Sequence, residues 1–288
     1  MIREINEKHR QLHALLKNTG GLVVAYSGGC DSTLLACVAR EALGSRSLCV
    51  LLSSESYTRN ETDQALQTAG ALGLSIVTIR EEMAGDNDFT ANTPERCYFC
   101  KKRLFARLFE IARQRSLGFV ADGSNLDDSS DYRPGRRASQ ELGVISPLQE
   151  AGFTKDDVRE LSRQLNLPTW NKPSLACLAS RIPYGTRIEP AILERIGRAE
   201  QFLNERGFRQ VRVRHHGNIA RIEVDPDEIQ RLAASENRND VETEFKKLGY
   251  LYVTLDLNGY KTGSMNAVLT SGQTQQNALP HSEKPFTD

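Results

Sequence analysis

The first half of the chain alternates short apolar runs with longer segments in which apolar residues recur every three or four positions. Runs of the length of buried strands cover residues 21–25, 47–52, 74–80 and 118–121. Helical spacing covers residues 1–17, 31–43 and 59–73, and a further helix follows Lys102 and runs to about residue 115. Alternating strands and helices of these lengths predict a parallel sheet with right-handed crossovers, which is the Rossmann-like class of α/β fold.

The pattern becomes less regular after residue 121. Residues 144–148 are predicted to form a last strand, and residues 154–165 a helix whose N-cap is Thr154, with Asp157 completing a capping box. Residues 168–185 then combine prolines with apolar and aromatic side chains. This composition argues against disorder, and ordered loops of that length are usually functional.

A second unit begins near Glu189. Pro190 opens a helix that Gly207 closes, residues 211–214 and 219–224 alternate as a hairpin around residues 215–218, and further helix and strand patterns start at residues 226 and 250. This order predicts a small α+β domain. We therefore expect a nucleotide-binding domain at 1–185, an α+β domain for substrate binding or oligomerisation at 186–270, and a flexible polar tail at 271–288.

Composition excludes some function classes. Lysine plus arginine equals aspartate plus glutamate at 37 each in 288 residues, so no global charge favours nucleic acid. No apolar run approaches the ~20 residues of a membrane span, and the charged amphipathic N-terminus does not resemble a signal peptide. We expect a cytoplasmic protein without membrane or nucleic-acid partners. Its 6 cysteines are too few for a disulfide scaffold.

The strongest chemical signal is the segment Ser27-Gly28-Gly29-Cys30-Asp31-Ser32, between the first strand and its helix. Its glycines allow positive φ and close backbone approach, so that successive N–H groups converge on an anion. The helix dipole adds to that attraction, and Asp31, Ser32 and Thr33 are suited to cap the helix. The Walker lysine is missing. The segment therefore predicts a phosphate-binding loop that resembles the pyrophosphate loop of PP-loop ATPases.

Two further residues belong to the predicted nucleotide site. Ser53 follows the second strand at the sheet edge where doubly wound folds bind ligands. Asp31 is a candidate to hold Mg²⁺ beside the phosphates, because magnesium prefers carboxylate and phosphate oxygens. The expected cofactors are thus ATP and Mg²⁺.

Three cysteines form the second candidate site. Cys97 and Cys100 lie at a predicted helix start and Cys177 lies in the loop 168–185, whereas Cys30, Cys37 and Cys49 are given structural roles. A four-ligand zinc site lacks partners, since no second Cys-x-x-Cys or suitably spaced histidine pair exists. Three thiolates can instead hold three irons of a [4Fe–4S] cluster and leave the fourth open. That interpretation requires the cysteines to meet in space.

The chain resembles the LarE-type PP-loop sulfur transferases, which help to build the nickel-pincer cofactor of lactate racemase. The matching segments run through nearly the whole length: Ser27–Ser32, Asp131-Tyr132-Arg133-Pro134-Gly135, Asn171-Lys172, Ser180–Gly185, Val211–Arg214, Ile219–Glu223 and Tyr252–Asp256. The resemblance implies adenylation of a carboxylate of pyridinium-3,5-dicarboxylate mononucleotide, the nickel-pincer precursor, followed by displacement of AMP by sulfur. It also implies a homo-oligomer, with sulfide or a desulfurase as donor.

Family members differ in their sulfur source. Some give up the sulfur of one cysteine, whereas others resemble this chain in having three cysteines around an iron–sulfur cluster. The presence of Cys97, Cys100 and Cys177 favours the cluster type, with a single sacrificial cysteine, Cys177 first, as the alternative.

Candidate substrate-binding residues lie in the second half of the chain. Arg212 and Arg214 alternate on one face of a predicted strand, where planar guanidinium groups can bind a substrate phosphate. The competing interpretation is a solvated strand face. Arg181 and Glu200 are further candidates, although Glu200 is also compatible with a helix-surface acid.

Three other functions remain open. An amidotransferase or NAD-synthetase relative would use ammonia and would not need the three cysteines. A tRNA-thiolating enzyme would carry a basic groove and bind RNA in a salt-dependent way. A nucleotide-binding regulatory module would bind ATP without releasing pyrophosphate.

Overall fold

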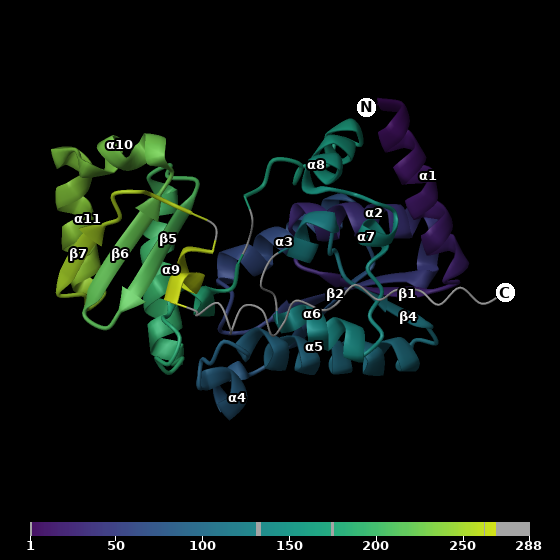
Figure 1. Cartoon of the computed structure of the whole chain (residues 1–288), viewed down its shortest axis with the longest axis horizontal. Coiled ribbons are helices and arrows are strands. Elements are labelled where there is room, and N and C mark those ends of the chain that lie inside the picture. Colours follow the sequence, from purple (N-terminus) through teal and green to yellow (C-terminus); the bar gives the residue numbers. More distant parts are fainter. Residues whose placement is uncertain (1, 131–133, 174–175, 262, 269–288) are drawn as a thin grey trace.

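The computed structural model describes residues 2–130, 134–173, 176–261 and 263–268. Within them the chain forms a larger α/β part and a smaller α+β part that lie side by side (Figure 1). The predicted tail at 271–288 and the matching residues Asp131-Tyr132-Arg133 lie outside the described residues.

The larger part is built around a four-stranded parallel sheet of order β3-β2-β1-β4. Its strands are β1 (Leu22–Tyr26), β2 (Ser47–Ser53), β3 (Ile76–Arg80) and β4 (Phe119–Ala121). Its helices are α1 (Ile2–Asn18), α2 (Cys30–Leu43), α3 (Arg59–Ala71), α4 (Asn87–Thr90), α5 (Arg96–Gln114), α6 (Pro134–Glu141), α7 (Pro147–Glu150) and α8 (Lys155–Gln164). The predicted α/β class with a parallel sheet is confirmed. All four strands point their carboxyl ends to one edge, where a ligand site is expected.

Apolar faces explain why these segments pack as they do. Leu12 and Leu16 of α1 are fully buried with Leu34 and Leu35 of α2 on one face of the sheet. On the other face, Phe105 of α5 belongs to a cluster formed by the opposite sides of β1 and β2. The predicted capping box of α8 is confirmed: the Thr154 hydroxyl accepts from the Asp157 backbone N–H at 3.2 Å.

The predicted strand at 144–148 is wrong. Only Ile145 continues the sheet, through a single parallel bridge to Ala121. Pro147 has no N–H to donate to a ladder, and its fixed φ suits the first turn of α7, which begins there. The chain therefore leaves the sheet after one residue of pairing.

The smaller part is a three-stranded sheet of order β5-β6-β7 covered by helices on one face (Figure 1). Its elements are α9 (Pro190–Glu205), β5 (Val211–His216), β6 (Ile219–Val224), α10 (Ile229–Ala233), α11 (Ser235–Lys247) and β7 (Tyr252–Leu255). β5 and β6 form the predicted hairpin, and β7 lies parallel to β6. The predicted turn at 215–218 is wrong in extent, because His215 and His216 belong to β5 and only Gly217 and Asn218 remain as the loop.

The two sheets have separate apolar cores, and a third cluster joins the parts. That cluster combines Met83 and Phe89 with Leu178, Ile188 and Ile196. The boundary at 185/186 stays a prediction, since this packing crosses it. None of the helices in the described ranges has the length and apolar character needed to cross a membrane.

Candidate active site

The predicted phosphate loop lies between β1 and α2, at the carboxyl edge of the parallel sheet. The Ser27 and Ser32 hydroxyls lie 3.0 Å apart, and the Ser32 hydroxyl accepts from the Ser27 N–H at 3.2 Å. These bonds close the loop on itself and hold its backbone in a tight turn. A turn of this kind at a helix N-terminus presents backbone N–H groups to an anion.

Glycine is required at the centre of this loop. Gly28 has φ +69°, and a Cβ placed there would lie 2.6 Å from the Cβ of Ala65 in α3. The helix begins at Cys30 with Gly29 as its N-cap, and no side chain makes the capping bond. The expectation that Asp31, Ser32 and Thr33 cap the helix is thus wrong by position, because these residues already lie within its first turn.

A lysine from a distant segment reaches the loop. The Lys172 ammonium group donates to the carbonyl oxygen of Gly28 at 3.1 Å. Burial lowers the pKa of Lys172 below its ordinary value, which signals an ammonium group partly removed from water. Cys30 fixes the same segment from the other side, since its thiol lies 3.7 Å from the carbonyl oxygen of Trp170. The structure thereby supplies a cation near the loop, in the absence of a Walker lysine.

The candidate magnesium residue Asp31 is held by two partners. One carboxylate oxygen accepts from the side-chain amide of Asn125 at 3.0 Å, and the other forms an ion pair with Lys155. Asn125 follows β4, so the ends of β1 and β4 meet here. Gly123 allows this approach, since a Cβ at that position would lie 3.0 Å from the backbone nitrogen of Ser32.

The segment after β2 joins the phosphate site to the cysteine site. Ser53 is the last residue of β2, and its carbonyl oxygen accepts from the Glu81 N–H at 3.0 Å. Three residues later, the carbonyl oxygen of Ser56 accepts from the Leu178 N–H at 2.8 Å. Cys177 therefore lies directly beside the carboxyl edge of the large sheet.

The three candidate cysteines share one neighbourhood. Cys97 and Cys100 lie in the first turn of α5, and Cys177 immediately precedes a short 3-10 turn at Leu178–Arg181. Cys100 and Cys177 pack against the same apolar cluster. Burial raises the pKa of the Cys97 thiol and raises that of Cys100 to about 12, and the charge of Cys177 adds to both shifts. Burial raises the pKa of the Tyr57 hydroxyl, and the nearby thiols of Cys177, Cys100 and Cys97 raise it further.

The described residues contain no group of three His, Cys, Asp or Glu side chains arranged to hold a metal ion. All three thiols are partly buried, and Cys177 contributes to the raised pKa of both Cys97 and Cys100. The donor set fits the soft thiolate ligation that iron–sulfur clusters use.

Arg181 and Glu200 form a buried ion pair. The guanidinium donates to both carboxylate oxygens at 2.8 and 2.9 Å, and it also donates to the carbonyl oxygens of Ala176 and Cys177 at 2.7 and 3.0 Å. Glu200 accepts in addition from the backbone N–H of Val213. The interpretation of Glu200 as a helix-surface acid is wrong, since it is only 7 % exposed.

Arg212 and Arg214 are buried beside this pair, so the solvated strand face is also excluded. Arg214 donates to Glu223 at 2.6 Å and to the carbonyl oxygen of Ser180 at 3.3 Å, and its Nε is buried without a hydrogen-bond partner in the described structure. Burial lowers the pKa of Arg212, and the nearby Arg181 lowers it further. A bound anion would accept a hydrogen bond from the Arg214 Nε and would favour the charged form of Arg212.

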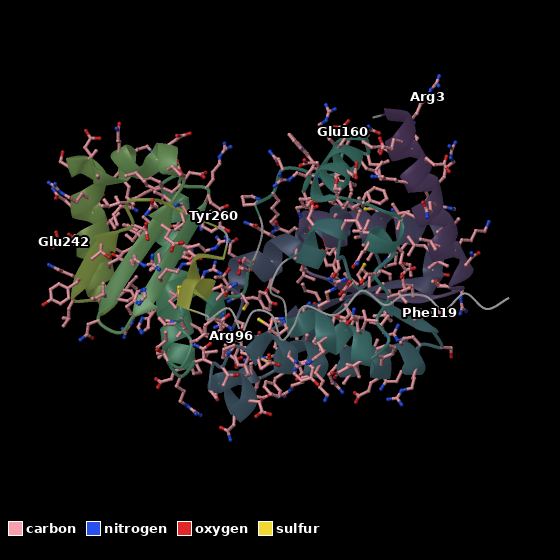
Figure 2. All side chains as sticks on the ribbon, viewed as in Figure 1. Arg3, Arg96, Phe119, Glu160, Glu242 and Tyr260 are labelled. Carbon is pink, nitrogen blue, oxygen red and sulfur yellow. The ribbon has the colours of Figure 1, made fainter. Side chains whose placement is uncertain are left out.

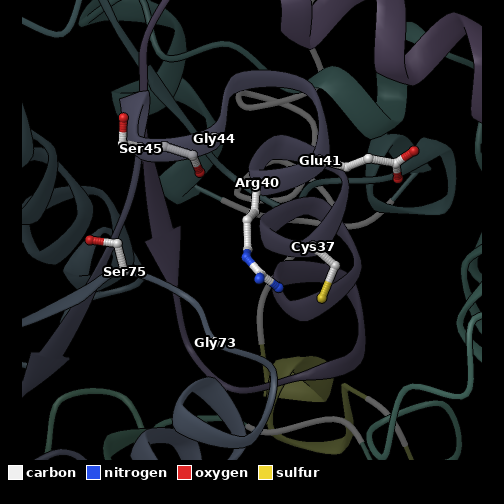
Figure 3. A pocket seen from close by; sticks show the side chains of 8 residues that line it. Cys37, Arg40, Glu41, Gly44, Ser45, Gly73 and Ser75 are labelled. Carbon is white, nitrogen blue, oxygen red and sulfur yellow. The ribbon is translucent and has the colours of Figure 1, made fainter.

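A separate cavity lies elsewhere and does not belong to this site. It has a volume of about 690 Å³ and is lined by Cys37, Arg40, Glu41, Gly44, Ser45, Ser47, Gly73 and Ser75 (Figure 3). Ser47 begins β2, so this hollow opens at the amino ends of the strands. Ligands of parallel sheets bind at the opposite edge, where the phosphate loop lies.

Several residues of this site could not be found by reasoning from the sequence. Lys155 and Asn125 contact Asp31 across 124 and 94 positions of the chain, and Lys172 contacts Gly28 across 144. The only signal for Lys172 is its place in a segment shared with the family. Lys155 had no signal of its own, because it has the pattern of an ordinary first-turn helix residue.

Comparison with known proteins agrees with this geometry. The NAD synthase family matches residues 4–113, which include the phosphate loop. The chain is 39% identical to the pyridinium-3,5-bisthiocarboxylic acid mononucleotide synthase of Lactiplantibacillus plantarum, over 92% of this chain and 96% of that protein. It is 42% identical to an uncharacterised protein of Synechocystis, over 86% and 92% of the two chains. It is also 29% identical to the glutamine-hydrolysing GMP synthase of Pectobacterium carotovorum, over 51% and 31%.

Proposed function

Because the chain belongs to the LarE family of pyridinium-3,5-bisthiocarboxylic acid mononucleotide synthases, we propose that it inserts sulfur into pyridinium-3,5-dicarboxylate mononucleotide. It is an ATP-dependent enzyme of the PP-loop type. A substrate carboxylate oxygen attacks the α-phosphorus of ATP, the bond to the β-phosphate breaks, and pyrophosphate leaves. Sulfur then attacks the acyl carbon and AMP leaves, which gives a thiocarboxylate. Two such events, one on each carboxylate, give the bisthiocarboxylate product.

One observation carries this proposal. The segment 168–185 contacts the phosphate loop through Lys172, bears Cys177, and offers the Ser180 carbonyl oxygen to Arg214. A single segment thus touches the nucleotide site, the sulfur site and the arginine site. An acyl-adenylate formed at the nucleotide site needs a nearby source of sulfur, which the sulfur site would provide. The phosphate of a mononucleotide substrate suits the arginine site.

Each site residue has a task in this reaction. The phosphates are bound by the backbone of Ser27, Gly28, Gly29 and Ser32. Lys172 and Ser53 lie at the same edge of the sheet. Asp31 would help to hold Mg²⁺ after its ion pair with Lys155 has broken. Bound magnesium would neutralise the charge of the phosphates. Arg212 and Arg214 bind the substrate phosphate, while Arg181 and Glu200 fix the loop beside it.

For the sulfur source we propose that Cys97, Cys100 and Cys177 hold a [4Fe–4S] cluster. Three thiolates would leave one iron of such a cluster without a protein ligand, and the bound cluster would supply sulfur to the acyl-adenylate. The apolar cluster that Cys100 and Cys177 share, and the place of Cys97 and Cys100 near the start of α5, support this assignment. The source of this sulfur would be free sulfide, or the persulfide of a desulfurase after reduction to sulfide by a thiol.

The experiment is iron and acid-labile sulfide analysis of anaerobically purified protein, with pyrophosphate release measured in the same samples. We expect about four irons per chain, lost in each of Cys97→Ala, Cys100→Ala and Cys177→Ala, while pyrophosphate release persists. Pyrophosphate release without iron, with sulfur transfer lost only in Cys177→Ala, would replace the cluster by a sacrificial cysteine. Formation of a carboxamide from ammonia in place of a thiocarboxylate, unaffected by all three substitutions, would favour an amidotransferase.

A further inference from the structure

A buried asparagine lies between the two cysteine segments. Asn92 is 0% exposed and has φ +52°, a left-handed conformation that few residues other than glycine adopt. Its side-chain amide donates to three backbone carbonyl oxygens, those of Ile182 at 3.3 Å, Pro183 at 2.8 Å and Thr186 at 2.8 Å. All three belong to the segment that follows Cys177.

The other end of the same side chain contacts the cysteine helix. The amide oxygen of Asn92 accepts from the guanidinium of Arg96, which is itself 4% exposed. Arg96 is the first residue of α5 and immediately precedes Cys97. Figure 2 shows Arg96 at the end of α5 nearest the smaller sheet, and its guanidinium lies 4.9 Å from the ring centre of Tyr184.

Backbone bonds reinforce the connection. The Gly185 N–H donates to the carbonyl oxygen of Asn92 at 3.0 Å, and the Ile188 N–H donates to that of Thr90 at 2.9 Å. The short segment 90–92 is therefore joined to the segment 182–188 by both main chain and side chain. Asparagine suits this position because it tolerates the left-handed region and offers two donors and one acceptor from one group.

We propose that Asn92 is a positioning residue that sets the distance between Cys97 and Cys100 on α5 and Cys177 on its loop. This inference rests on the proposed function, because it gives the three thiols one shared task. The side chain of Asn92 bonds to the cysteine segments and, within the described residues, not to the phosphate loop, so its role belongs to sulfur delivery and not to adenylation. A shift of about 1 Å between reacting groups is enough to lower a rate about a hundredfold.

The test uses Asn92→Gly, which keeps the left-handed backbone accessible and removes only the amide. The matched control is Asn166→Gly, at an exposed asparagine with φ +53° after α8. We expect hydrogen exchange of peptide 176–188 to accelerate at least tenfold in metal-free Asn92→Gly and to stay unchanged in the control. Single-turnover sulfur transfer should fall about tenfold or more, while ATP-dependent pyrophosphate release is retained.

The outcomes separate this inference from the proposed function. Unchanged exchange, or faster exchange with unchanged sulfur transfer, overturns the positioning role. Failure of the unsubstituted protein to transfer sulfur overturns the proposed function, and the loop's protection in Asn92→Gly then still decides whether Asn92 fixes the two segments. If Asn92→Gly does not fold, Arg96→Met removes the same connection from the helix side, and the same loss of sulfur transfer with retained pyrophosphate release is expected.

Discussion

At the residue scale, charged groups of the proposed nucleotide site are held by protein partners. Asp31 is paired with Lys155, and Lys172 donates to a carbonyl oxygen of the phosphate loop. Asp31, whose proposed ligand is a cation, is paired with a lysine, and Lys172, whose proposed ligand is an anion, donates to an oxygen. Binding of ATP with magnesium would exchange each internal contact for a stronger one, since phosphate oxygens carry full charge.

Lys172 gives the first prediction. Lys172→Met removes the ammonium group that lies at the loop, and charge-assisted hydrogen bonds contribute about 1.5–3 kcal/mol. We therefore expect the KM for ATP in pyrophosphate release to rise about tenfold or more. Lys247→Met is the control, because Lys247 is exposed and, among the described residues, pairs only with Glu244 in the same helix. Equal KM values for ATP in the two variants would show that Lys172 does not contribute to ATP binding.

The second prediction concerns the protonation of Cys100. Burial and the charge of Cys177 raise the pKa of its thiol to about 12, so the metal-free thiol is almost entirely protonated at pH 8. Only the thiolate is nucleophilic, and alkylation by iodoacetamide should be about a thousandfold slower than in the urea-unfolded chain. The folded thiol keeps its proton between pH 9 and 12 while the unfolded thiol loses it, so stability falls as pH rises through that window.

Mass spectrometry of Cys100 labelling between pH 7 and 10 checks this. The folded rate should still rise tenfold per pH unit at pH 10, whereas the unfolded rate levels off above pH 9. A folded rate that levels off near pH 9 would contradict the raised pKa and the buried setting from which it follows.

At the element scale, the parts of the fold that follow from local signals were predictable. The strand, glycine turn and helix around Gly28 are specified by adjacent residues, and the α8 capping box by Thr154 and Asp157. The prediction of a strand at 144–148 was wrong because Pro147, within the apolar run, begins helix α7. The contacts of Asn92 and Lys155 could not be predicted, because they depend on segments that only the tertiary structure brings together.

The capping box of α8 gives the third prediction. Asp157 accepts from the Thr154 N–H at 2.9 Å and from Lys8 of α1 at 2.7 Å. Burial by itself would raise its pKa, but the hydrogen bonds from Lys8 and Thr154 outweigh this effect and lower it. A lowered pKa adds stability above the unfolded value of about 4, and this stability is lost as pH falls through the folded value.

Asp157→Asn should therefore reduce the free energy of unfolding by about 1 kcal/mol at pH 7. The difference from the unsubstituted protein should shrink steadily as pH falls below about 4. Urea denaturation at a series of pH values measures this difference in the free energy of unfolding. The control is Asp227→Asn, in the exposed turn before α10. A cost that does not change with pH would assign the effect to packing instead of charge.

At the scale of the whole molecule, the smaller sheet completes the site that the larger one begins. Glu200 of α9 accepts from the Val213 N–H of β5 and from Arg181, whose guanidinium also donates to the Cys177 carbonyl oxygen. The cysteine loop is thus fixed to the smaller sheet by Arg181 and to α5 by Asn92. Contacts from both parts of the molecule therefore hold the segment that bears Cys177.

The last prediction tests that dependence. Arg181→Met leaves the Glu200 carboxylate buried without its cation, and removing one partner of a buried ion pair costs about 3–5 kcal/mol. Arg181→Met combined with Glu200→Gln should recover much of that loss, since the amide still accepts from Val213 and carries no charge. The exposed pair of Arg206 and Asp240, at 3.1 Å, should show a coupling of about 1 kcal/mol or less in the same double-mutant cycle.

Stability and catalysis should separate in the double variant. It would regain the fold but not the guanidinium that holds the carbonyl oxygens of Ala176 and Cys177, so sulfur transfer should stay low while pyrophosphate release returns. Recovery of both would mean that the ion pair only stabilises the junction between the sheets. Recovery of pyrophosphate release alone would mean that the smaller sheet acts on the cysteine loop, through Arg181, in the step that follows adenylation.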